Sequence, residues 1–172
     1  MLQLGPKWLR LHDAAEPEKL IEGVYLQLRK FRVREPESYP IRLNRIDIAL
    51  DVRGLHTADF SVDAWRHLWV CRSSKRVSYD DPKTGELSGI DFGSSDGAVR
   101  FKFYDKLLHA EQHNALLFWL SVWNIPPAVY EEQDDLAVTR LEWSFYPYRG
   151  KFTGLRYLHE FSFDGVKGLL NY

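Results

Sequence analysis

Alternation of apolar and charged residues in three separate stretches is the feature that most limits how this chain can fold. The stretches read NRIDIALD (44–51), VRFKFYDK (99–106) and TRLEWSF (139–145). Successive side chains of a strand point to opposite sides of a sheet, so each stretch predicts a strand with one apolar and one charged face. Such alternation is typical of antiparallel sheets that pack on one side only.

Similar patterns assign the rest of the chain. Alternation and turn residues predict strands over residues 7–12, 41–52, 75–80, 88–93, 98–104 and 138–146, of which 75–80 and 88–93 form a hairpin. Helical spacing of apolar residues predicts helices over 16–31, 61–71 and 106–123. A Pro-Pro pair at 126–127 ends the last helical segment. This order favours an α+β fold, with a largely antiparallel central sheet, helices packed on one face, and an open face that carries the active site. We expect residues 1–172 to form a single catalytic domain.

Composition restricts the function classes. Hydrophobic residues make up 45% and charged residues 27%, as in a folded domain. The net charge of −1 gives no overall attraction to nucleic acid, so a nucleic-acid site needs locally clustered cations. One cysteine excludes an internal disulfide and fits a reducing compartment, and no apolar run is long enough for a membrane span. We therefore expect a cytoplasmic protein without membrane association.

The charged sides of the predicted strands hold unusual residues. Asp47 and Glu142 lie mid-strand, where acidic residues are disfavoured, and each follows an arginine by two positions. A solvated sheet face explains any one strand alone. If the strands are neighbours, however, two carboxylates, several cations and Tyr104 converge on one surface.

That combination suits phosphodiester chemistry. Mg²⁺ or Mn²⁺ is commonly held by one or two carboxylates together with substrate phosphate oxygens, and the ion then neutralises charge that develops on those oxygens. Tyr104 would be the nucleophile, with its phenolate stabilised by the cations Arg100, Lys102 and Lys106. Asp105 should point to the other face of its strand and is ranked below Asp47 and Glu142.

The motifs RIDIALDV, IDFGSSDGAVRFKFYDKLLHAE and TRLEWSF, in this order, resemble the Rep_trans family of rolling-circle plasmid replication initiators and related conjugative-element relaxases. The resemblance covers roughly residues 7 to 146 and matches the order and spacing of the family's motifs. It implies a DNA-nicking and strand-transfer endonuclease. In this reaction a tyrosine attacks one DNA strand, leaving a 5′-phosphotyrosyl link and a free 3′-hydroxyl to start rolling-circle replication or transfer.

By resemblance, the nucleophile falls on Tyr104 and the metal ligands on Asp47 and Glu142, while Asp51 and Lys106 match further patterned positions. Single-stranded or origin DNA would be the substrate, and a host helicase and polymerase would be partners. A homodimer and the type of element (plasmid, phage or chromosomal) stay open. Because family members are usually longer, with flanking parts implicated in origin recognition, the chain would be either a core without those parts or a compact phage or chromosomal relative.

From these considerations we predict a set of site residues by role. The catalytic residues are Tyr104, Lys106 and Arg100. The metal ligands are Asp47, Glu142 and Asp51. The DNA-binding residues are Arg45, Lys102, Arg140, Arg149 and Lys151, of which the last two come from the basic, aromatic stretch YPYRGKFTGLRY (146–157).

Two other readings stay open. GAVRFKFY resembles the aromatic strand of an RNA-recognition sheet, which would make the chain a non-catalytic single-stranded nucleic-acid-binding module. A degenerate nicking fold with a regulatory role is the other. His109 and His113 in HAEQH lie one helical turn apart, but they are better explained as a solvated pair than as a metal site. Trp119 and Trp123 are expected to pack in the core.

Overall fold

The computed structural model describes residues 42–61, 75–94, 96–149 and 155–157, together with residues 19, 22, 23, 26 and 160. The chain divides into two compact units, one formed by Met1–Ile46 with Tyr146–Tyr172 and the other by Asp47–Phe145. The strand predicted at 7–12, the helix predicted at 61–71 from residue 62 onward, most of the helix predicted at 16–31, and Lys151 lie outside the described residues.

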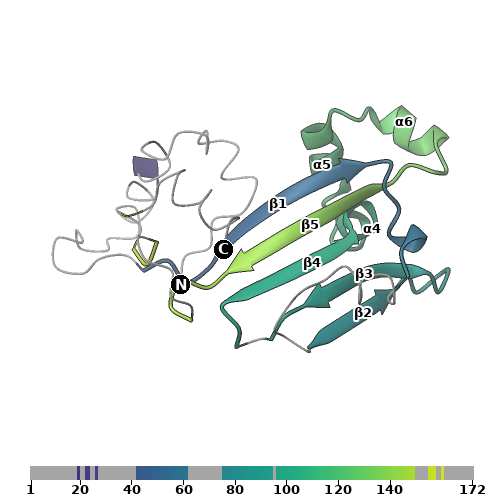
Figure 1. Ribbon diagram of the computed structural model, residues 1–172. Helices are drawn as coiled ribbons and strands as arrows, with labels where there is room; N and C mark the ends of the chain where they lie inside the picture. Colours follow the sequence, from purple (N-terminus) through teal and green to yellow (C-terminus); the bar gives the residue numbers. More distant parts are fainter. Residues whose placement is uncertain are drawn as a thin grey trace. The chain divides into compact units, whose positions relative to one another are not determined.

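A five-stranded antiparallel sheet forms the centre of the described chain (Figure 1). Its strands are β1 (Ile46–Arg53), β2 (Arg76–Asp80), β3 (Leu87–Phe92), β4 (Val99–Asp105) and β5 (Val138–Phe145), in the spatial order β1-β5-β4-β3-β2. The α+β prediction with a largely antiparallel sheet is confirmed. The predicted hairpin is also present, as β2 and β3.

Strand register places the polar side chains in rows across the sheet. Tyr104 of β4 lies opposite Gly89 of β3 and Arg140 of β5, and Lys102 lies opposite Asp91 and Glu142. Directly opposed residues share a face, so these residues mark one side of the sheet. We call this side the charged face; its residues are Asp51, Val77, Tyr79, Gly89, Asp91, Arg100, Lys102, Tyr104, Arg140, Glu142 and Ser144.

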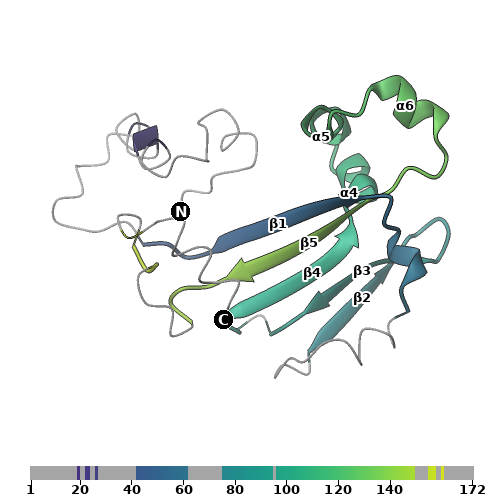
Figure 2. The ribbon, with the colours of Figure 1, turned by 45° about the horizontal axis from the view of Figure 1, so that its top comes forward.

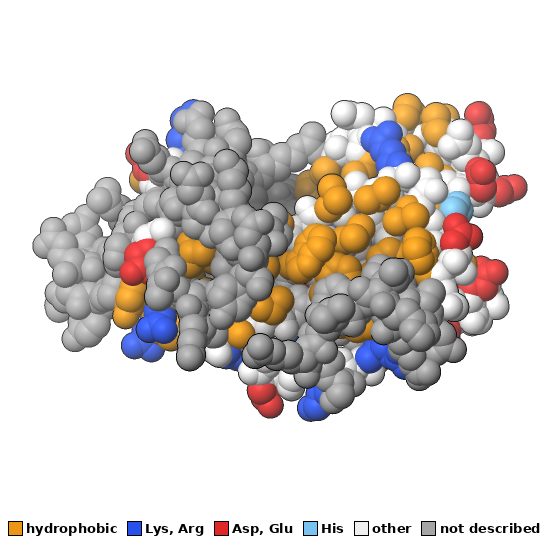
Figure 3. All heavy atoms as spheres, in the orientation of Figure 1, with side chains coloured by type: hydrophobic (Ala, Val, Ile, Leu, Met, Phe, Trp, Pro, Cys, Tyr) orange, Lys and Arg blue, Asp and Glu red, His pale blue; other side chains and the backbone are white. Residues whose placement is uncertain are grey.

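The opposite side of β3, β4 and β5 is apolar. Its buried centre consists of Ile90, Phe92, Phe101 and Phe103, against which Leu141 and Trp143 pack. The Phe101 and Trp143 ring centroids lie 5.0 Å apart. Hydrophobic side chains gather over the middle of the sheet in the orientation of Figure 1 (Figure 3). The predicted alternation therefore sorts these strands correctly into an apolar and a charged side.

The helix predicted over 106–123 is wrong, because the structure has two helices there, α4 (Lys106–Gln112) and α5 (Leu116–Trp123). The chain turns between them at Asn114, whose φ of 53° is left-handed and incompatible with a continuing helix. Asparagine is one of the few residues that adopts this conformation readily. At the start of α4, the Asp105 carboxylate accepts a hydrogen bond from the Leu108 amide at 2.9 Å and acts as the N-cap.

A further short helix follows the proline pair. Helix α5 ends at Trp123 with Asn124 as its left-handed C-cap, before the prolines that were expected to end it, and Pro127 occupies the first position of α6 (Pro127–Glu132). Proline is well suited to that position because its missing N–H would be unpaired there anyway. None of the helices in the described ranges is long and apolar enough to cross a membrane.

Helices α4 and α5 contact the charged face at one end of the sheet. Figure 2 shows both helices at the end where β1 and β4 finish and β5 begins. Trp119 and Trp123 of α5 are buried, as expected, in a cluster with Val138, which shares the face of Arg140 on β5. The sequence had suggested helices only on the apolar side. These two instead cover part of the charged face, because the tryptophan rings pack against its ionic side chains.

Candidate active site

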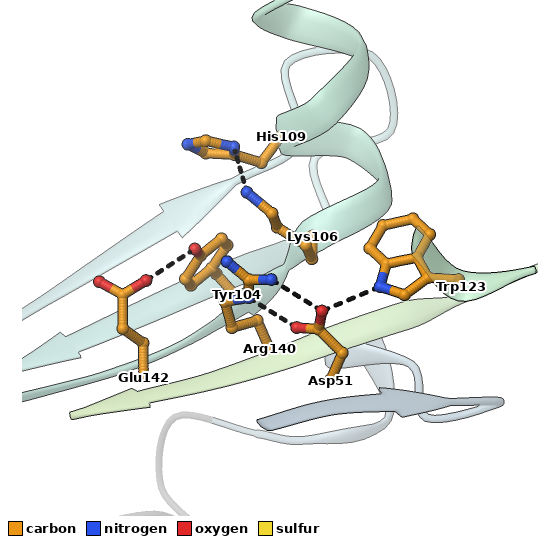
Figure 4. Close-up of polar contacts among 7 residues, drawn as sticks. All are labelled: Asp51, Tyr104, Lys106, His109, Trp123, Arg140 and Glu142. Atoms are coloured by element: carbon orange, nitrogen blue, oxygen red, sulfur yellow. Dashed lines mark hydrogen bonds and ion pairs between the residues drawn. The ribbon is translucent and has the colours of Figure 1, made fainter. Parts of the chain in front are cut away.

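A direct hydrogen bond between Tyr104 and Glu142 is the centre of the charged face. The Tyr104 hydroxyl donates to Glu142 Oε2 at 3.1 Å (Figure 4). The two residues lie on neighbouring strands and are diagonal to each other, since Tyr104 is opposite Arg140 and Glu142 is opposite Lys102. Glu142 is buried and Tyr104 is half-buried. A phenol and a carboxylate 38 positions apart in the chain are thus in contact.

The environment of Tyr104 favours its neutral form. Burial raises the pKa of Tyr104 above its ordinary value, and the negative charge of Glu142 raises that pKa further, while Arg140 lowers it only in part. The net effect is opposite to the stabilised phenolate that the clustered cations suggested. Attack by this hydroxyl on a phosphate therefore needs a proton acceptor, and Glu142 already accepts its hydrogen bond.

Two of the predicted cations are engaged by carboxylates. Lys102 Nζ lies 3.6 Å from Glu142 Oε1, and Arg100 forms an ion pair with Asp91. Asp91 is buried, and its Oδ1 has no hydrogen-bond partner among the described residues. The sequence analysis missed Asp91, although an acidic residue in mid-strand was the signal that singled out Asp47.

Asp51 and Arg140 form a buried ion pair between β1 and β5. Arg140 Nε lies 2.6 Å from Asp51 Oδ1, and Arg140 Nη2 lies 2.7 Å from Asp51 Oδ2. The Trp123 indole N–H also donates to Oδ2, at 2.9 Å. Burial alone would raise the pKa of Asp51, but these hydrogen bonds hold the pKa below its ordinary value. Both carboxylate oxygens are occupied in this arrangement, so Asp51 orients Arg140 rather than offering a vacant ligand (Figure 4).

Arg140 is held on a second side by an aromatic ring. Its guanidinium lies 4.3 Å from the centroid of Trp119, in cation–π geometry. With Asp51 on one side and Trp119 on the other, the guanidinium is fixed opposite Tyr104 on the neighbouring strand. The sequence predicted Arg140 as a DNA-binding residue. The structure gives it a fixed orientation close to the tyrosine.

Lys106 lies at the junction of β4 and α4 and is buried. Its ammonium lies 4.4 Å from the Trp119 ring centroid, 5.8 Å from the Tyr104 ring centroid and 3.3 Å from His109 Nδ1. Burial, reinforced by the positive charge of Arg140, lowers the pKa of Lys106 to about 8. A lysine with a pKa near neutrality is able to give or take a proton during a reaction.

The two histidines of α4 lie beside this lysine. Burial, with the charge of Lys106 next in size, lowers the pKa of His109 to about 4, so His109 is neutral at pH 7. The His109 and His113 rings are stacked with their centroids 4.1 Å apart. His113 Nδ1 lies 2.9 Å from the His109 carbonyl oxygen. Both rings therefore make local contacts, and His109 is partly buried rather than fully solvated as expected.

The remaining predicted residues in the described ranges are Asp47, Arg45 and Arg149. Asp47 is exposed on β1, four positions before Asp51 and so on the same face. Regular strand spacing puts its Cα about 8 Å from the Cα of Glu142. Arg45 is exposed and belongs to the other compact unit, as does Arg149, whose guanidinium lies 4.4 Å from the Tyr146 ring centroid.

The carboxylates of this site can be compared with the ligands that a divalent ion requires. The described residues contain no group of three or more His, Cys, Asp or Glu side chains arranged to hold a metal. Mg²⁺, however, often takes only one or two carboxylates and completes its shell with substrate phosphate and water. Glu142 and Asp47, on neighbouring strands and offset by two residues along them, are the pair that could form such a site. An ion at Glu142 would have to replace its contact with Lys102 or with Tyr104. Asp51 does not fit it while Arg140 holds both of its oxygens.

Compared with known proteins, the chain matches no family model, no curated protein and no solved structure.

Proposed function

We propose that this chain is a metal-dependent DNA-nicking and strand-transfer enzyme in which Tyr104 is the nucleophile. The hydrogen bond from the Tyr104 hydroxyl to Glu142 at 3.1 Å carries the proposal. It joins a potential nucleophile to a potential base, in a site that also holds the oriented cation Arg140 and the buried Lys106. A nucleophile within hydrogen-bond reach of a base is the arrangement that covalent catalysis requires.

In the proposed reaction the Tyr104 oxygen forms a bond to the phosphorus of a DNA phosphodiester, and the bond from phosphorus to the 3′-oxygen breaks. The phenol proton passes to Glu142. Lys106 supplies a proton to the departing 3′-oxygen, leaving a 3′-hydroxyl and a 5′-phosphotyrosyl link. Arg140, held by Asp51 and Trp119, binds a phosphate oxygen. Asp47 and the second carboxylate oxygen of Glu142, which does not take the proton, would hold Mg²⁺ or Mn²⁺, and the ion would supply further neutralisation of charge on the phosphate oxygens.

The experiment is incubation of the protein with end-labelled single-stranded oligonucleotides of varied sequence and Mn²⁺. We expect cleavage with the 5′-labelled side released and the 3′-labelled side covalently attached to protein. Attachment should be abolished in Tyr104→Phe and reduced by orders of magnitude in Glu142→Gln. Attachment that persists in Tyr104→Phe would contradict the assignment of the nucleophile.

A second candidate is a non-catalytic single-stranded nucleic-acid-binding module, or a regulatory relative that has lost activity. The observation that favours it is the raised pKa of Tyr104, which burial and Glu142 keep in the neutral phenol form. This candidate predicts nucleic-acid binding that is unchanged in Tyr104→Phe and in chelator, with no covalent product on any substrate. Replication initiation, a host helicase and a host polymerase remain proposals that depend on the nicking activity.

A further inference from the structure

Tyr79 of β2 lies in the same row of the charged face as Tyr104. It is opposite Gly89 of β3, and Gly89 is opposite Tyr104 of β4. Directly opposed residues point to the same side of a sheet, so both tyrosine side chains belong to the charged face. Two strand spacings separate their Cα atoms, which is about 10 Å.

An exposed apolar strip is present at this position. Tyr79 is 52% exposed, and Val77, two residues earlier on the same side, is also 52% exposed. Strand β2 is an edge of the sheet that the structure describes. Edge strands usually carry charged residues that discourage association. A half-exposed aromatic residue next to a half-exposed valine is therefore a feature that a purely structural edge strand does not need.

The pairing of β2 with β3 becomes irregular next to Tyr79. The register shifts between Tyr79 and Asp80, because β3 has one extra residue, Ser88, between their partners Gly89 and Leu87. The Ser88 hydroxyl donates to the Tyr79 carbonyl oxygen at 3.1 Å and fixes this irregularity. Bulges are over-represented beside active sites, where they re-aim a side chain.

Gly89 leaves the row without a side chain between the two tyrosines. A Cβ built on Gly89 would lie 2.9 Å from the Cβ of Tyr104, closer than real Cβ contacts. The glycine is thus required by the close approach of Tyr104. As a consequence, no β3 side chain stands between the Tyr79 and Tyr104 positions in this row.

A partly exposed cation lies in the adjacent row. Lys102 of β4, with 32% of its side chain exposed, lies between Asp91 on β3 and Glu142 on β5. Because Arg100 pairs with Asp91 and Lys102 with Glu142, these four side chains together carry two positive and two negative charges. Single-stranded nucleic acids are bound by aromatic side chains that stack on bases next to cations that contact the backbone. The same combination is found here within two strand spacings of the candidate nucleophile.

We propose that Tyr79, with Val77, is a stacking subsite for one unpaired nucleobase of the strand whose phosphate lies at Tyr104. This proposal rests on the proposed function, since it names the nucleotide that neighbours the phosphate under attack. The subsite reads the flat face of a base and is therefore tolerant of sequence. It accounts for the exposure of Tyr79.

The test is fluorescence anisotropy with labelled oligothymidylate and with an abasic oligomer of the same length, using the full chain carrying Tyr104→Phe so that no covalent product forms. We expect tighter binding of oligothymidylate than of the abasic oligomer. Adding Tyr79→Ala should weaken oligothymidylate binding roughly 5- to 100-fold, the range measured for loss of one stacked base, and should leave abasic binding unchanged. Tyr79→Trp should preserve the preference, and Leu117→Ala, another exposed hydrophobic residue on α5, is the matched control.

Equal binding of the two oligomers, absence of binding to either, or no effect of Tyr79→Ala would overturn the subsite. Loss of self-association in Tyr79→Ala without loss of base preference would instead identify β2 as an edge that pairs with a second copy, and would also overturn it. Covalent attachment with unaltered base preference in Tyr79→Ala would refute the subsite and leave the nicking reaction standing. A base preference that depends on Tyr79, without covalent attachment in the chain that retains Tyr104, would support the subsite and refute the nicking reaction.

Discussion

The charge of Glu142 raises the pKa of Tyr104, and this effect is the basis of the proposed chemistry. Burial contributes most to the raised pKa of Tyr104, and the Glu142 charge contributes next. A phenol in this state becomes a competent nucleophile only when its proton has somewhere to go. The hydrogen bond to Glu142 Oε2 provides that acceptor.

Replacing Glu142 with Gln should therefore lower the pKa of Tyr104 toward its ordinary value of about 10, without reaching it, because burial remains. The measurement is the pH dependence of the Tyr104 ring ¹³C signal by NMR, assigned by comparison with Tyr104→Phe. A Tyr104 titration that is the same in the wild type and in Glu142→Gln would contradict the coupling.

Lys106 gives a second residue-level prediction, through its pKa of about 8 in the folded chain against 10.5 for an ordinary lysine. Below pH 8 the lysine is protonated in both the folded and unfolded states. Between about pH 8 and pH 10 the folded state releases the proton while the unfolded state retains it, so the free energy of unfolding should rise with pH. Above pH 10 the ionising tyrosines, whose folded-state pKa values are raised, act in the opposite direction.

Denaturant unfolding across this window is the measurement for Lys106. The rise should be smaller in Lys106→Met and in Lys106→Arg, because neither variant releases a proton there. A rise of wild-type size in both variants would show that another group causes it.

At the level of elements, helix α5 is fastened to the sheet by polar contacts as well as by packing. Trp123 donates to Asp51, Asp51 holds Arg140, and Arg140 lies against Trp119. Arg140 and Asp51 expose only 10% and 18% of their side chains. Removing one partner of such a pair leaves a poorly hydrated charge behind.

Asp51→Ala should lower the free energy of unfolding by about 3 kcal/mol, at the lower end of the range for breaking a buried pair because Asp51 is partly exposed. Trp123→Phe should lower the free energy of unfolding by less than Asp51→Ala does, because it removes one hydrogen bond and keeps most of the apolar contact. Asp135→Ala, in the exposed loop before β5, is the control and should change stability by less than about 0.5 kcal/mol. Equal changes in the free energy of unfolding for Asp51→Ala and Asp135→Ala would show that the ion pair does not stabilise the fold.

Gly89 tests the packing of β3 against β4. Gly89→Ala introduces a Cβ at 2.9 Å from the Tyr104 Cβ. The Tyr104 Cβ is bonded directly to the backbone of β4 and therefore has little freedom to move away. We expect a loss of about 1–3 kcal/mol in stability from overpacking, measured by denaturant unfolding, and a larger proportional loss of nicking. Ser78→Ala, on exposed β2, should be close to neutral. A fully stable and active Gly89→Ala would show that β3 moves away from Tyr104 at little energetic cost.

For the whole molecule, the period-two alternation was sufficient to predict the strands that became β1, β4 and β5 and to sort their faces. It also indicated that Tyr104 and Glu142 lie on one surface, because both occupy charged positions of neighbouring strands. It did not predict the pairing of β1 with β5, which brings Asp51 to Arg140 across 89 positions. Strand order depends on contacts between distant residues, and a single strand's pattern carries no information about them.

Local sequence patterns also failed at residues whose role depends on their backbone conformation or on contacts with distant residues. The run over 106–123 is apolar enough for one helix, but Asn114 adopts a left-handed conformation and divides it. Trp119 and Trp123 were expected only as core residues, yet the same rings contact Arg140, Lys106 and Asp51. Asp91 was missed because its strand was identified as half of a hairpin without its polar side being followed across to Lys102.

The most direct test of the central claim is mass spectrometry of the covalent product formed with single-stranded DNA and Mn²⁺. After protease and nuclease digestion, the account predicts a nucleotide attached through its 5′-phosphate to Tyr104, in the peptide that spans β4 and α4. Attachment at a different residue, or a cleaved DNA strand with no nucleotide on any peptide, would contradict it.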